Sequence, residues 1–161
     1  MSNEEIGSED AYERFLKEGY SKLLGAVYLM VNDKGIAEDI VQETFARAYL
    51  NWTKLWPVGN PGGWTYRVAS NLATSWRRKL IREAKMLSRL KTTVRNPGPE
   101  ELVDPDLQRL VAGLPTRQRQ AVVLHYVLGL PLEEIATAMK VRVGTVKSCL
   151  HAARESLRRN L

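Results

Sequence analysis

Apolar residues recur at helical spacing along almost the whole chain, and the alternation typical of strands is nearly absent. In the first half, for example, Leu24, Val27 and Val31 fall on one face of a helix. The sequence therefore predicts an all-α fold. The predicted helices cover 11–31 (as one or two elements), 36–52, 64–90, 105–113, 116–128 and, as two elements, 132 to the end.

Two stretches rich in proline and glycine interrupt this pattern. Residues 56–63 hold two prolines and three glycines, so they are predicted to form a loop. A second break at 96–101 divides the chain into two parts, each large enough for a small helical domain. We therefore predict domains at 1–90 and 107–161, joined by a flexible linker over 91–106.

The last predicted pair of helices carries the pattern of a helix-turn-helix. Its first helix would bury Ile135 and Ala136, and its second would be seated by Val146 and Leu150. The outward face of the second helix would fit the major groove of DNA, where hydroxyl and basic side chains reach base edges and phosphates. A helical hairpin with a basic exterior is the alternative. The outward residues are Thr145, Lys147, Ser148, His151 and Arg154.

Charge is segregated along the chain. The formal net charge is +6, but residues 1–45 carry 4 basic and 10 acidic side chains, whereas residues 46–95 carry 11 basic and one acidic. Basic side chains follow phosphates and aromatic rings stack on unpaired bases, so the basic segment predicts contact with single-stranded nucleic acid. Packing between helices is the alternative, which we expect for one or two of its tryptophans. All four tryptophans lie in this segment: Trp52, Trp56, Trp64 and Trp76.

Side chains suited to catalysis or metal binding are scarce. Cys149 is the only cysteine, and His125 and His151 are the only histidines. Metal sites and activated nucleophiles need clusters of such residues, and no glycine-rich nucleotide-binding motif occurs. We predict a protein that is not an enzyme, with no catalytic residue, metal or cofactor.

Two features argue against membrane insertion and export. The longest stretch in the first half that is free of charge and of strong polarity, 23–31, is much shorter than the ~20 residues of a membrane-spanning helix. The N-terminus is acidic, whereas a secretory signal begins with basic residues. We expect a cytoplasmic protein without membrane insertion.

Two blocks of sequence resemble the extracytoplasmic-function (ECF) sigma factors, the small two-domain members of the sigma-70 family of bacterial transcription initiation factors. The first block reads AEDIVQETF over 37–45 and WTYRVASN over 64–71. The second contains LP at 114–115, EIA at 134–136 and GTVKS at 144–148. The resemblance implies a sigma factor that binds core RNA polymerase, directs initiation at specific promoters and melts the minus-ten element.

A polar face on the second predicted helix is the candidate polymerase contact. Asp39, Gln42 and Glu43 share this face because they are spaced i, i+3 and i+4. The resemblance implies that the face binds the clamp helices of the polymerase beta-prime subunit. It further implies contacts with the beta subunit and a dedicated anti-sigma protein as partner. A solvent-exposed acidic helix is the alternative.

The resemblance also assigns contacts with promoter DNA. The loop from Trp52 to Gly63, which includes Trp56, matches the family's pocket for a flipped base of the minus-ten element, and the linker around 80–106 would thread the polymerase channels. The helix that begins near Val143 would read the minus-thirty-five element as duplex. Minus-ten contacts are expected from Trp52, Trp56, Trp64, Arg67, Asn71, Arg77, Arg78 and Lys79, and minus-thirty-five contacts from Arg142, Thr145, Lys147, Ser148, His151 and Arg154.

Four positions in the C-terminal block depart from the family pattern. Lys140 stands where the turn of the helix-turn-helix usually has glycine, so a non-glycine residue is expected at positive φ. Arg142 replaces a usual serine, which removes a helix cap worth ~1 kcal/mol and adds a phosphate ligand. Cys149 and Ala152 replace usual arginines, so reading of the duplex is expected to be weak or altered.

Two other functions fit parts of the sequence. One is a stand-alone helix-turn-helix transcriptional regulator, whose N-terminal half would sense a signal or dimerise. The other is a decoy that occupies the polymerase clamp without directing initiation.

Overall fold

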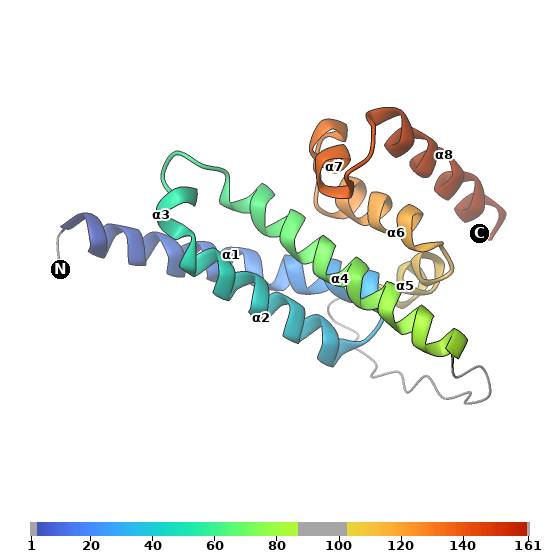
Figure 1. The fold of residues 1–161 in the computed structure, drawn as a ribbon, viewed down its shortest axis with the longest axis horizontal. Coiled ribbons are helices and arrows are strands. Elements are labelled where there is room, and N and C mark those ends of the chain that lie inside the picture. Colours follow the sequence, from blue (N-terminus) through green and yellow to red (C-terminus); the bar gives the residue numbers. More distant parts are fainter. Residues whose placement is uncertain (1–2, 87–102, 161) are drawn as a thin grey trace.

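The structure is a computed structural model that describes residues 3–86 and 103–160. Within these residues every regular element is helical, which confirms the predicted all-α fold (Figure 1). The elements are α1 (Asn3–Val31), α2 (Lys34–Leu50), α3 (Trp52–Leu55), α4 (Pro61–Met86), α5 (Pro105–Ala112), α6 (Thr116–Val122), the π-helical turn η1 (Val123–Val127), α7 (Leu132–Met139) and α8 (Val143–Arg159).

A tight turn between α1 and α2 sets the first helix pair. Asn32 ends α1 in the left-handed conformation, with φ of 58°. Asp33 then caps α2, because its side chain accepts a hydrogen bond from the Ile36 backbone N–H at 3.0 Å. With so short a connection, α1 and α2 pack side by side as an antiparallel pair.

The loop predicted over 56–63 is shorter in the structure. It covers only 56–60, because α4 begins at Pro61, three residues before the predicted start. Proline suits the first position of a helix, where its missing N–H costs nothing. Asn60 closes the helix start by accepting a hydrogen bond from the Gly63 N–H at 3.0 Å.

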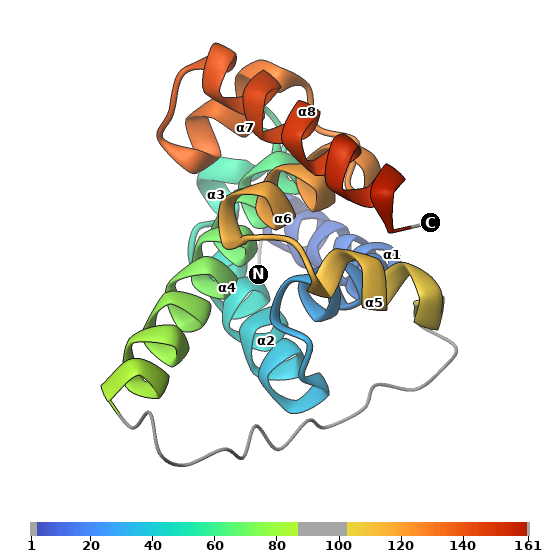
Figure 2. The same ribbon diagram turned by 90° about the vertical axis from the view of Figure 1, so that its right-hand side faces the viewer.

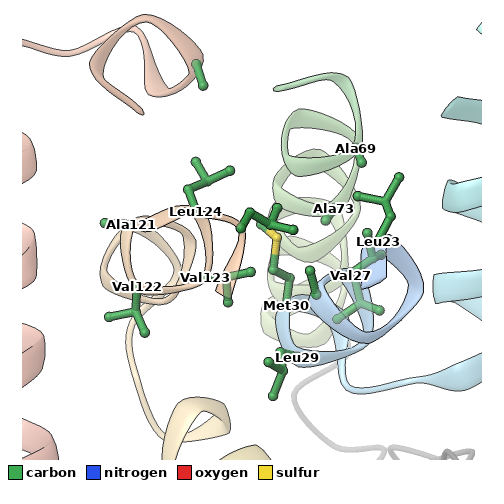
Figure 3. Close-up of a cluster of buried hydrophobic side chains, with 14 of the residues drawn as sticks. Leu23, Val27, Leu29, Met30, Ala69, Ala73, Ala121, Val122, Val123 and Leu124 are labelled. Carbon is green, nitrogen blue, oxygen red and sulfur yellow. The ribbon is translucent and has the colours of Figure 1, made fainter. Parts of the chain in front are cut away.

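The N-terminal half packs α1, α2 and α4 around one core. Small residues on α4 let it approach α1 closely, as Figure 3 shows for Ala69 and Ala73 beside Leu23 and Val27. All four side chains are buried.

The C-terminal half is built as the sequence predicts. Ile135 and Ala136 of α7 are buried, as are Val146 and Leu150 of α8. Helices α6 and α7 both pack against α8, and Lys140 joins α7 to α8 with φ of 57°, which confirms the expected non-glycine at positive φ.

The two halves lie against each other and share one buried cluster. Met30 of α1 belongs to the same cluster as Val123 and Leu124, and α6 and α7 both contact α4 (Figure 2). The predicted linker, 91–106, lies outside the described residues except for 103–106, where Asp104 caps α5.

Candidate nucleic-acid interface

The polar face predicted on α2 is on the surface. Asp39, Gln42 and Glu43 are all exposed, whereas Val41 and Phe45 on the opposite side are buried. The Glu43 carboxylate pairs with the Arg47 guanidinium at 2.8 Å. Asp39 and Gln42 therefore leave a carboxylate and an amide exposed on this face, and no salt bridge between described residues includes Asp39.

Trp52 lies in the core, contrary to its predicted place among the DNA contacts. Its side chain is only 5% exposed, and its indole N–H donates a hydrogen bond to the Ser8 carbonyl oxygen at 2.9 Å. The rings of Tyr12 and Phe15 lie against it, each with its centroid 5.4 Å away. An incoming base therefore finds no free face on Trp52.

Trp56 is half-buried and stacks on Trp52, with ring centroids 6.5 Å apart and an angle of 7° between the planes. The position of Trp52 could have been found in the sequence, since it continues the buried stripe of Val41, Phe45 and Ala48 at helical spacing. Because Trp52 is an aromatic residue at the start of the basic segment, the sequence favoured a DNA contact for it instead.

One face of α4 brings together three predicted minus-ten residues. Trp64 is half-buried, Arg67 is exposed and Asn71 is half-buried, at spacings of three and four residues. Trp64 and Arg67 line a cavity of about 390 Å³, together with Asn60 and Gly63 from the start of α4. The opposite wall comes from the C-terminal half, through Leu130, Glu133, Glu134 and Thr137.

The basic residues that follow on α4 divide into two groups. Arg77 is half-buried: its Nε donates to Thr116 Oγ1 at 2.9 Å and its Nη1 to the Met30 carbonyl oxygen at 3.5 Å. Burial lowers the pKa of this guanidinium. Arg77 is thus an internal contact in this structure, and its contact with a DNA phosphate stays a prediction. Arg78 and Lys79 are exposed as predicted.

The second helix of the helix-turn-helix, α8, presents a polar face. Thr145 is half-buried, and the other five predicted residues are exposed. Arg142 precedes α8 and makes no side-chain cap, as its identity predicts. The Ser148 hydroxyl donates to the Gly144 carbonyl oxygen at 3.0 Å. The exposed residues are Arg142, Lys147, Ser148, His151 and Arg154.

Tyr126 is a surface residue that the sequence analysis did not single out. It is 55% exposed, and its hydroxyl accepts a hydrogen bond from Arg154 Nη1 at 3.0 Å. It lies in η1, where the extra residue of a π-turn alters the helical register, so simple helical spacing gives no signal for its exposure. Tyr126 therefore orients the side chain of Arg154, which is one of the predicted DNA contacts.

Comparisons with known proteins agree with this arrangement. The chain matches the family model of sigma-70 region 2 over residues 15–83 and that of sigma-70 region 4 over residues 105–157. These two regions define a class of bacterial transcription initiation factors, which are not enzymes.

Within that class, the chain is 30% identical over 170 residues to the ECF RNA polymerase sigma factor SigW of Bacillus subtilis, covering 96% of this chain and 91% of that protein. It is also 31% identical over 156 residues to the ECF RNA polymerase sigma factor SigE of Mycolicibacterium smegmatis, covering 92% of this chain and 60% of the length of that protein. The chain belongs to the ECF sigma factors.

Solved structures share the fold. The sigma factor RpoE of Bartonella quintana, solved with the anti-sigma factor NepR, has a TM-score of 0.74 at 23% identity, covering 92% of this chain and 95% of that one. CnrH, solved with the cytosolic domain of CnrY, has a TM-score of 0.67 at 21% identity, covering 94% of this chain and 87% of that one.

Two further findings concern the described residues only. None of their helices combines the length and the apolar character needed to cross a membrane. Nor do they hold a group of three or more side chains that could bind a metal ion.

Proposed function

We propose that this protein binds core RNA polymerase and directs promoter-specific initiation, using α2 for the polymerase, α4 for the minus-ten element and α8 for the minus-thirty-five element. The observation that carries the proposal is the division of surface chemistry among these three helices. An acidic and amide-bearing face lies on α2, an aromatic and basic face on α4, and a basic face on α8.

On α4, Trp64, Arg67 and Asn71 can act on an unpaired base together. An indole ring stacks on a base, a guanidinium binds phosphate or stacks, and an amide reads a base edge by donating and accepting hydrogen bonds. Melting a duplex costs a few kcal/mol for each unstacked step, which contacts made only to the open strand can offset. These residues therefore favour the open promoter over the closed one. Arg78 and Lys79 would hold the adjacent phosphates.

On α8, the exposed residues suit a duplex. A helix presented by a helix-turn-helix enters the major groove, where His151 would reach a base edge and Arg142 and Lys147 would reach phosphates. With Cys149 and Ala152 in place of arginines, this reading contributes less affinity than α4 and the polymerase do.

The partners follow from these surfaces. The beta-prime clamp of core polymerase is the partner of Asp39 and Gln42, with a second contact to the beta subunit, and the ligand is promoter DNA. An anti-sigma protein is a further partner, and the support for it is that the sigma factor RpoE, which shares this fold, was solved with the anti-sigma factor NepR. The protein would act in the cytoplasm, where polymerase and promoters are found.

The test is transcription in vitro with purified core polymerase on a genomic DNA library, followed by mapping of start sites. We expect transcripts that begin at defined sites and depend on this protein. A protein that binds core polymerase without producing them would be a decoy. A protein that ignores polymerase and binds duplex DNA alone would be a stand-alone regulator.

A further inference from the structure

Helix α4 and the end of α7 enclose a cavity of about 180 Å³. The wall from α4 is one helix face that carries Asn71, Thr74 and Arg78, at spacings of three and four residues. The wall from α7 ends at Lys140, which holds the left-handed conformation. A cavity needs only about 10–15 Å³ to hold one water molecule, so this one has room for a small polyatomic ligand.

The walls of this cavity are positively charged. Arg78 contributes a guanidinium group from one wall and Lys140 an ammonium group from the other, and none of the described residues that line the cavity is acidic. Neither cation takes part in a salt bridge between described residues. The C-terminal end of α7 opposes these two charges with only about half a negative charge. The cavity therefore attracts an anion, and most strongly one with two negative charges.

The larger cavity at the start of α4 has the opposite character. Its lining includes Glu133 and Glu134 of α7 but only one cation, Arg67. Positive charge without a compensating carboxylate is therefore a property of the 180 Å³ cavity in particular, and not of the whole boundary between α4 and α7.

The cavity wall also offers uncharged hydrogen-bond donors. Thr74 is buried, and its Oγ1 has no hydrogen-bond partner within the described part of the chain. A buried polar atom in this state costs free energy, which a ligand oxygen bound to the hydroxyl would recover. Asn71 is half-buried and adds an amide group that can donate hydrogen bonds. Two cations with several N–H and O–H donors match the charge and the oxygen atoms of a phosphate group.

We propose that the free protein binds a phosphate group in the cavity between α4 and the end of α7. Arg78 and Lys140 are its charged ligands, and Thr74 and Asn71 are its uncharged donors. Inorganic phosphate and the phosphate of a nucleotide are the two sources of such a group. The inference does not rest on the proposed function, because it concerns the protein without polymerase or promoter DNA.

Arg78→Gln and Lys140→Gln test the charged ligands. The full-length protein is titrated with inorganic phosphate in a calorimeter, at an ionic strength held constant with sodium chloride. We expect one phosphate per chain and at least about tenfold weaker affinity in each variant, as for loss of a hydrogen bond to a charged group. Both side chains are exposed, so circular dichroism should show intact helices.

Arg82→Gln and Arg117→Gln are the respective controls. Each removes an exposed positive charge from the same half of the protein, at a residue that does not line the cavity. Phosphate affinity should stay within about twofold of wild type in both, because exposed charges at a distance are screened by salt. Equal weakening in the controls would reduce the effect to general attraction of anions and overturn the site.

Thr74→Val should act on the free and the bound protein in opposite directions. Valine keeps the branched shape and removes an unpartnered polar atom, so the melting temperature without phosphate should stay the same or rise. Phosphate affinity should fall about fivefold, which corresponds to one neutral hydrogen bond. Unchanged affinity in this variant would overturn the proposed set of ligands.

Thr44→Val is the control for loss of a buried hydroxyl. The Thr44 hydroxyl donates to the Ile40 carbonyl oxygen at 2.8 Å in the core, and Thr44 does not line the cavity. This variant should therefore melt at a lower temperature than wild type and bind phosphate with unchanged affinity. Together the two threonine variants separate an effect on the site from an effect on the fold.

A parallel titration with adenosine monophosphate distinguishes the two sources of the phosphate group. Tighter binding of adenosine monophosphate, with the same dependence on Arg78 and Lys140, would identify a nucleotide as the ligand, whereas tighter binding of inorganic phosphate would identify the free ion. Either probe should also raise the melting temperature, by about 3–6 °C at ten times its Kd. Absence of saturable binding by both probes would overturn the proposal. Neither titration contains polymerase, so failure of the proposed function in the transcription assay is a separate result.

Discussion

Arg119 of α6 donates a hydrogen bond from Nη1 to the carbonyl oxygen of Met30, 89 residues earlier in the chain, at 3.0 Å. Met30 lies in the last turn of α1, where helix carbonyls lack intrahelical partners and attract positive charge. The same carbonyl oxygen also accepts from Arg77 of α4 at 3.5 Å. Guanidinium groups from both halves of the protein therefore meet at the end of one helix.

Arg119→Met is expected to destabilise the protein strongly. Arg119 is only 2% exposed and also donates to the carbonyl oxygens of Ala112 and Leu114. Methionine would fill the space but leave two buried acceptors and one part-buried acceptor without this donor, at a cost of about 2–4 kcal/mol. Urea unfolding followed by circular dichroism measures the loss of stability.

Arg117→Met is the control, at an exposed position two residues earlier, and it should change the free energy of unfolding by less than about 0.5 kcal/mol. Equal effects of the two substitutions would contradict the role of Arg119.

The double variant Asp39→Ala, Gln42→Ala is expected to bind core polymerase at least about tenfold more weakly than wild type. The loss of a contact at the centre of an interface typically lowers affinity by this amount or more. Both side chains are exposed, so the fold should be intact by circular dichroism. Affinity is measured by titrating labelled protein with core polymerase. Glu18→Ala, which removes an exposed carboxylate from α1, is the control for charge alone. Unchanged binding of the double variant would remove α2 from the polymerase contact.

The sequence predicted the helices well because their apolar spacing is local information. The burial of Ile135 and Val146 follows from apolar residues a few positions apart, whereas the left-handed Lys140 was expected from the glycine that the resembled family usually has there. Trp52 was expected at the DNA because composition cannot tell a ring that stacks on DNA from one that packs in a core. The hydrogen bonds of Arg77 to Thr116 and Met30 could not be foreseen, because they join residues far apart in the chain.

The packing of the two halves against each other could not be predicted for a related reason. Ser70 and Gln120 are 50 residues apart, and their hydrogen bond depends on how two packed units meet. Neither residue departs from its own helical pattern. Only the three-dimensional arrangement brings α7 over the face of α4 that carries the predicted minus-ten residues.

Asn71→Ala is expected to impair promoter opening more than closed-complex formation. The amide would contact a base only after the strands separate, so its loss should cost about 1–3 kcal/mol in the open complex and little before it. Permanganate footprinting of the melted region measures opening, and gel shift at low temperature measures the closed complex. Ser75→Ala, one turn further along α4 and exposed, is the control.

The same variant can be tested on a template that is already melted. A pre-melted bubble removes the cost of strand separation but keeps the contact between Asn71 and the unpaired base. Asn71→Ala should therefore still bind the bubble more weakly than Ser75→Ala does. If bubble binding is insensitive to the substitution, Asn71 is no part of the minus-ten pocket.

Lys147→Ala is expected to lower the salt dependence of promoter binding. Lys147 is exposed on α8, and no salt bridge between described residues includes it, so in the complex it is available to displace one counterion from the duplex. Each neutralised phosphate contributes about 0.9 to the slope of log K against log salt concentration. Holoenzyme binding to a mapped promoter, titrated at several salt concentrations, should give a slope smaller by that amount. Lys17→Ala, which removes an exposed charge from the acidic α1, should leave the slope unchanged. A slope that stays the same in Lys147→Ala would place this side chain away from the phosphates. If the sequence preference of this variant were relaxed as well, the side chain would contact a base edge.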